Sequence, residues 1–112
     1  MNIQIFGKNK CFDTKKAERY FKERRIKFQR IDLAKYGLSP REFDTVRRAV
    51  GLDAMINRDS KDYEASFIAH LAYEADIVDK LFEMPSLLKS PIVRNGKQVT
   101  IGYCPDVWAT WE

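Results

Sequence analysis

The chain has 112 residues, of which 45% are hydrophobic and 32% are charged, and its formal net charge is +4. A chain of this length and mixed composition predicts one folded domain over residues 1–112 and excludes a disordered protein. No long basic run predicts direct nucleic-acid binding, and no window approaches the ~18 apolar residues of a membrane span.

The first third of the chain predicts a strand, a helix and a second strand. Residues 2–6 and 28–33 alternate polar and apolar side chains, which is typical of short strands. Between them, a turn-like segment leads through Cys11 into a helix that Asp13 or Thr14 could cap. Strand, helix and strand within about thirty residues predict a parallel pair joined by a right-handed crossover.

The middle of the chain predicts helices. Ser39, Pro40 and Glu42 form a helix start in which Ser39 is the N-cap and Glu42 completes a capping box. Gly51 can end this helix. Residues 63–82 are rich in helix formers and predict two further helices, the last of which stops at 84–85.

The last part of the chain predicts a hairpin and a final helix. Strands over 91–94 and 97–102 flank Asn95-Gly96, a strong signal for a two-residue hairpin turn. Pro105 then opens a helix over 106–111. The order β-α-β, helical insert, β-hairpin and C-terminal α-helix predicts an α/β protein with a mixed β-sheet and a thioredoxin-like fold.

Cys11 is the thiol that the sequence places for chemistry, because it lies between a strand and the start of a helix. Free N–H groups and the helix dipole stabilise a negative charge there, so the thiolate is favoured. Lys8, Lys10, Lys15 and Lys16 add positive charge. A nucleophilic thiolate beside an anion site is what reduction of an oxyanion or a disulfide needs. The alternative is that Cys11 is a small buried hydrophobic residue.

The other reactive side chains give weaker signals. Cys104 is expected to be a half-buried residue before the last helix, and the alternative is that it resolves a disulfide on Cys11. His70 is the one histidine, and it is expected to be a structural residue on a helix. No spacing of cysteine and histidine suits zinc, so no metal is expected.

Several segments resemble the arsenate reductase-like family, which includes the ArsC reductases, the Spx regulators and the YffB group. Residues 5–17 resemble its active-site loop, in which a basic residue follows the cysteine at the spacing of Cys11 and Lys15. Residues 87–93 resemble its second hallmark, in which a proline, here Pro91, is typically cis and faces the thiol. Asn57-Arg58 resembles the basic site of its helical region, and residues 102–108 its C-terminal signature.

Two positions depart from that family pattern. Ser90 stands before Pro91, where the reductases usually carry an arginine that holds the oxyanion, and the alternation of a strand would place Lys89 on the opposite face. The lost guanidinium argues against arsenate reduction itself. Thr14 stands where redox-regulated Spx proteins carry a second cysteine, and the chain ends at 112 without their basic extension, which argues against a regulator.

The resemblance implies a cytoplasmic, bacterial, thiol-dependent oxidoreductase in which Cys11 attacks an oxidised substrate. The anion or substrate site would comprise Lys8, Thr14, Lys15, Arg58, Ser90 and Pro91. A small thiol such as glutathione, or glutaredoxin, would complete turnover without a bound cofactor, and a monomer is expected because no heptad pattern is sustained. The alternatives are an Spx-like regulator that binds the RNA polymerase α subunit, or a redox-inactive family member.

Overall fold

In the computed structural model, which describes residues 1–111, the sheet has four strands in the order β2-β1-β3-β4. β1 (Ile3–Gly7) pairs in parallel with β2 (Phe28–Asp32) and antiparallel with β3 (Ile92–Asn95), which pairs antiparallel with β4 (Gln98–Ile101). The predicted parallel pair and mixed sheet are therefore confirmed.

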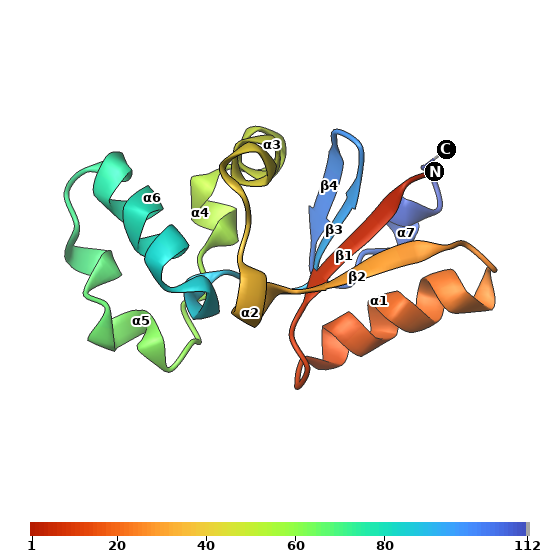
Figure 1. Cartoon of the computed structure of the whole chain (residues 1–112), viewed down its shortest axis with the longest axis horizontal. Helices are drawn as coiled ribbons and strands as arrows, with labels where there is room; N and C mark the ends of the chain where they lie inside the picture. The colour runs from red at the N-terminus through yellow and green to blue at the C-terminus, as the bar shows by residue number, and fades with distance from the viewer. Residues whose placement is uncertain (112) are drawn as a thin grey trace.

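Helices cover both faces of this sheet, and a helical lobe extends beyond its end (Figure 1). α1 lies against one face, α3 lies on the other side of the sheet, and α4 to α6 form the lobe (Figure 1). Their bounds are α1 (Phe12–Glu23), α2 (Leu33–Tyr36), α3 (Pro40–Val50), α4 (Leu52–Met55), α5 (Asp62–Ala65), α6 (Glu74–Glu83) and α7 (Pro105–Trp108), with 3-10 turns η1 (Ile68–His70) and η2 (Pro85–Leu87). Over residues 1–111, no helix has the length and apolar character that crossing a membrane requires.

Two hydrophobic clusters hold these layers together. Ile3 and Ile5 of β1 face a cluster that includes Phe21 of α1 and Trp108 of α7. Phe6 faces the opposite way, into the cluster that the helical insert contributes to. Because successive side chains of a strand point to opposite faces, a central strand buried on both sides carries apolar residues at both parities. β1 is therefore fixed in place up to the point where it enters the Cys11 loop.

The local capping signals predicted the third helix correctly. The Ser39 hydroxyl accepts from the Glu42 N–H at 3.2 Å, and the Glu42 carboxylate accepts from the Ser39 N–H at 2.8 Å. Gly51 ends the helix with φ at +87°, a conformation that residues with a Cβ rarely adopt.

The hairpin turn is displaced by one residue from its prediction. Asn95 still pairs with Gln98, so the turn consists of Gly96 and Lys97 rather than Asn95 and Gly96. Gly96 has φ at +61°, and a glycine at the first central position suits a tight hairpin turn.

The two helices predicted for 63–82 are present as α5 and α6, and α6 ends at Glu83 as predicted. Phe67, with φ at +57°, lies between the short α5 and the turn η1. Two other features differ from the predictions. The short helix α2 was not predicted, and the Asp32 carboxylate caps it by accepting from two backbone N–H groups. The last helix ends at Trp108, earlier than the predicted 111.

Candidate functional site

Cys11 lies where three parts of the fold meet. It follows the loop after β1, occupies the N-cap position of α1, and faces the segment that enters β3. The register pairs Phe6 with Ile92, so the end of β1 and the start of β3 are neighbours. The Cys11 thiol donates a hydrogen bond to the Ser90 carbonyl, with Sγ 3.7 Å from the oxygen. The Ser90–Pro91 peptide bond is cis, as the resemblance implied.

The environment of the thiol favours its charged form. Partial burial alone would raise the pKa of Cys11, but hydrogen bonding by the side chains of Ser90 and Thr14 lowers it. The backbone N–H groups of Thr14 and Asp13 act in the same direction. Together these donors place the pKa of the Cys11 thiol below that of an ordinary cysteine.

This arrangement corrects the predicted helix cap. Neither Asp13 nor Thr14 is the N-cap, because Cys11 holds that position and its side chain makes no capping hydrogen bond within α1. The first N–H groups of a helix have no partner inside the helix. The N–H groups of Asp13 and Thr14 at this helix start lower the pKa of the Cys11 thiol.

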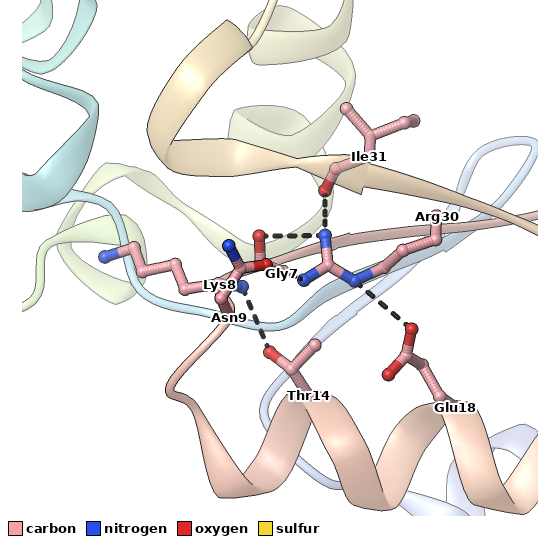
Figure 2. Close-up of polar contacts among 7 residues, drawn as sticks. All are labelled: Gly7, Lys8, Asn9, Thr14, Glu18, Arg30 and Ile31. Atoms are coloured by element: carbon pink, nitrogen blue, oxygen red, sulfur yellow. Dashed lines mark hydrogen bonds and ion pairs between the residues drawn. The ribbon is translucent and has the colours of Figure 1, made fainter.

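Thr14 also holds the loop that precedes the thiol. Its side chain is buried, and its hydroxyl accepts from the Lys8 N–H at 3.3 Å, as Figure 2 shows. One side chain thus fixes the start of the loop and contributes a donor to the thiolate at its end.

Lys8 ties this loop to the segment before Pro91. Its ammonium donates to the carbonyl oxygens of Leu88 at 2.7 Å and Ser86 at 3.1 Å. Burial lowers the pKa of the Lys8 ammonium, while the charges of Cys11 and Asp62 oppose that change. The attraction between Lys8 and Cys11 is mutual, so Lys8 both positions the loop and favours the thiolate.

Arg30 supports the same loop from β2, and sequence reasoning did not single it out. Its guanidinium donates to the carbonyl oxygens of Ile31 at 2.7 Å and Gly7 at 3.2 Å, and its Nε lies 3.3 Å from a carboxylate oxygen of Glu18 (Figure 2). One signal in the sequence could have identified Arg30. It is a charged residue within the alternating pattern of β2, on the face of the strand that lies against α1. A charged side chain at such a position needs a partner nearby.

A cavity of about 320 Å³ opens at the thiol. Its lining contains three lysines and, among the described residues, no carboxylate: Lys8, Lys10, Cys11, Asn57, Lys89 and Ser90. The structure thus corrects the prediction that Lys89 lies on the opposite face from Ser90. Residues 89–90 precede β3 and are not in a strand, so strict alternation does not apply to them.

Two predicted anion-binding side chains lie elsewhere. Lys15 lines a separate hollow of about 390 Å³ on the α1 and β2 side of the loop. Arg58 is exposed, and its guanidinium is paired with the Asp53 carboxylate. The neighbouring residue Asn57, and not Arg58, lines the thiol cavity. Lys8, Thr14 and Ser90 are the predicted residues that the structure brings to Cys11.

Cys104 is half-buried before α7, and its thiol donates to the Ile101 carbonyl at 3.4 Å. Burial raises the pKa of this second thiol, opposite to the direction at Cys11. Both cysteines are free, and Cys104 does not line the Cys11 cavity. Within residues 1–111, no three histidine, cysteine, aspartate or glutamate side chains gather as metal ligands.

Comparison with known proteins gives one consistent relationship. The sequence profile of the ArsC family matches residues 6–111. The global transcriptional regulator Spx 2 of Oceanobacillus iheyensis is 30% identical over 95% of this chain and 80% of its own length. An arsenate reductase from Vibrio cholerae superimposes with a TM-score of 0.83 at 21% identity, covering 96% of this chain and 94% of that one. A protein named YFFB gives 0.81 at 23% identity, covering 96% of each chain.

Proposed function

The chain belongs to the ArsC family, and from this membership and the Cys11 site we propose that it is a thiol-dependent oxidoreductase. The observation that carries the proposal is the position of Cys11, at the N-cap of α1 and against Ser90 of the segment that enters β3. The side chains of Ser90 and Thr14 and the backbone N–H groups of Asp13 and Thr14 all favour the thiolate. A thiolate is the reactive form in attack on a disulfide or an oxidised centre.

The reaction that this site supports is thiol–disulfide exchange. The Cys11 thiolate attacks one sulfur of a disulfide, a new S–S bond forms to Cys11, and the substrate S–S bond breaks. The departing thiolate takes up a proton from solvent. A second thiol, such as glutathione or a glutaredoxin, then attacks the mixed disulfide, releases the Cys11 thiolate and leaves its partner sulfur in a new disulfide.

Arsenate is a less suitable substrate for the observed cavity. The lining residues include three ammonium groups and no guanidinium. An ammonium is a compact, strongly hydrated charge, whereas a guanidinium offers a planar pair of donors that matches an oxyanion. We therefore place disulfides before arsenate as substrates.

The pH dependence of Cys11 alkylation tests the proposal. Iodoacetamide is used on a Cys104→Ser variant, so that Cys11 alone reports, and a Cys11→Ser variant provides the matched control through Cys104. We expect an apparent pKa for Cys11 below the ~8.5 of a free thiol, and a higher one for Cys104. An apparent pKa for Cys11 at or above that of Cys104 would overturn the proposal.

A second candidate is a regulator that binds the α subunit of RNA polymerase. The similarity to the transcriptional regulator Spx 2 favours it. Co-purification of the chain with the isolated α subunit tests this candidate. Absence of a complex at micromolar concentrations would reject it.

A further inference from the structure

We propose that Lys10 and Lys89 bind carboxylates of the substrate, so that the site selects disulfides that carry negative charge near the sulfur atoms. This inference rests on the proposed function, because it names the substrate class that Cys11 attacks. It starts from the unequal roles of the three lysines in the cavity.

Among those three lysines, only the Lys8 ammonium has hydrogen-bond partners within the described part of the protein. It donates to two backbone carbonyl oxygens, those of Ser86 and Leu88. Lys10 and Lys89 are exposed side chains that line the same cavity. Within residues 1–111, neither of their ammonium groups has a hydrogen bond, an ion pair or an aromatic partner. Both are therefore available to a ligand.

The backbone that carries Lys89 is held rigidly. The Lys89 N–H donates to the Met55 carbonyl at 2.9 Å, and the Asn57 N–H donates to the Leu87 carbonyl at 2.7 Å. These bonds flank a bridge between Ile56 and Leu88, both of which are buried. The bridge fixes the two segments that carry Lys89 and Asn57, both of which line the cavity at the thiol.

The backbone of Lys10 is fixed on the side of the loop. The Cys11 N–H donates to the Lys8 carbonyl at 3.2 Å, which closes a tight turn that contains Lys10. The thiol thus lies in a cavity to which separate segments each contribute a free ammonium group. Two separated charges suit a disulfide with a carboxylate on each arm better than one compact oxyanion. A cavity of about 320 Å³ is also of the size that small ligands occupy.

The test compares three disulfides of similar size that differ in charge: 3,3′-dithiodipropionate, bis(2-hydroxyethyl) disulfide and cystamine. The rate of mixed-disulfide formation on Cys11 is measured by mass spectrometry at low salt in the Cys104→Ser background. Each rate is divided by that of a short cysteine peptide with the same disulfide, which removes differences in leaving-group reactivity. We expect the order dianion, neutral, dication for the normalised rates.

The variant with both Lys10→Gln and Lys89→Gln should lose about tenfold in rate with the dianion, keep the neutral rate within about twofold, and gain with the dication. The matched control is Lys27→Gln with Lys97→Gln, which removes the same charge. Lys27 and Lys97 are exposed and adjoin Phe28 and Gln98, at the opposite end of the sheet from Cys11. The control should behave as the parent.

Two results would overturn the inference. One is an equal loss for all three disulfides in the Lys10 and Lys89 variant, which would show a structural effect. The other is a similar change in the Lys27 and Lys97 control, which would show a general effect of net charge. If none of the three disulfides reacts with Cys11 in the parent, the proposed function itself fails, and that outcome is distinct from the other two.

Discussion

Gly7 and Thr14 lie so close together that a Cβ on Gly7 would be 2.3 Å from Thr14 Cγ2 and 2.8 Å from its Oγ1. Real Cβ atoms do not approach other atoms to such distances, so glycine is required at the point where β1 enters the loop. The contact matters to the site because the Thr14 hydroxyl accepts from the Lys8 N–H and its side chain also favours the Cys11 thiolate.

Gly7→Ala should therefore destabilise the protein and weaken the thiol site together. We expect a loss of about 1–3 kcal/mol in the free energy of unfolding, measured by urea denaturation, because the added methyl overpacks a buried position. In the double variant with Thr14→Ala, the two shortest contacts are removed, and only the contact with the Cβ of residue 14, at 3.1 Å, remains. The two changes should consequently be less costly together than the sum of their separate effects, and strict additivity would contradict this account.

Thr14→Val should raise the pKa of the Cys11 thiol without changing the packing much. The substitution replaces the hydroxyl by a methyl group of similar size, so the thiolate loses one hydroxyl donor and the Lys8 N–H loses its acceptor. We expect alkylation of Cys11 at neutral pH to slow on the order of threefold, as the loss of about 0.7 kcal/mol implies. Thr14→Ser keeps the hydroxyl and should alkylate at nearly the parent rate. Equal slowing in both variants would show that the methyl group, not the hydroxyl, is responsible.

Lys8→Met should cost both stability and thiol reactivity. The Ser86 and Leu88 carbonyl oxygens lose a charged donor, for which we expect a loss of about 1–3 kcal/mol in urea denaturation. The pKa of Cys11 should rise because a nearby positive charge is removed. Lys10→Met provides the comparison, since that ammonium makes no such bonds. If Lys10→Met lost as much stability as Lys8→Met, the hydrogen bonds of the Lys8 ammonium to Ser86 and Leu88 would not account for the loss.

The titration of Cys11 should make stability depend on pH in a defined direction. Its pKa is lowered from 9.0, so the native state binds fewer protons than the unfolded state between the two pKa values. The free energy of unfolding gains this contribution as pH rises through that window. The gain is complete above the unfolded pKa and is lost as pH falls through the folded pKa.

Urea denaturation from about pH 6.5 to about pH 9.5 measures this contribution. The Cys104→Ser parent is compared with a variant that also carries Cys11→Ser, because the raised pKa of Cys104 would act in the opposite direction. The stability of the parent relative to the variant should increase with pH. A constant difference across the range would contradict the lowered pKa.

Thr100→Val should destabilise the cluster between the sheet, α1 and α7 and leave the thiol unaffected. The Trp108 indole N–H donates to the Thr100 hydroxyl at 2.7 Å, and both side chains are buried. Removing the acceptor leaves a buried N–H unsatisfied, at a cost of about 1–3 kcal/mol. The exposed change Thr110→Val should stay within about 0.5 kcal/mol of the parent. Cys11 alkylation should be unchanged in both variants.

Local patterns in the sequence were sufficient for most of the elements and for the position of Cys11 between a strand and a helix. The capping box of Ser39 and Glu42, the alternation in β1 and β2, and the position of Cys11 between a strand and a helix all depend on residues within a few positions of one another. Such signals persist in the folded protein because they arise from backbone hydrogen bonding and side-chain direction. At the hairpin turn, the local signal was displaced by a single residue.

The surroundings of the thiol were decided only by the tertiary structure. Lys89 and Asn57 reach Cys11 because a bridge between Ile56 and Leu88 joins segments that are far apart in the chain. Arg58 and Lys15, which the family resemblance had assigned to the site, do not line the thiol cavity, because the direction of a long side chain depends on its packing and its partners. The sequence by itself thus determined which thiol lies at the start of a helix, whereas long-range contacts determined which charges surround it.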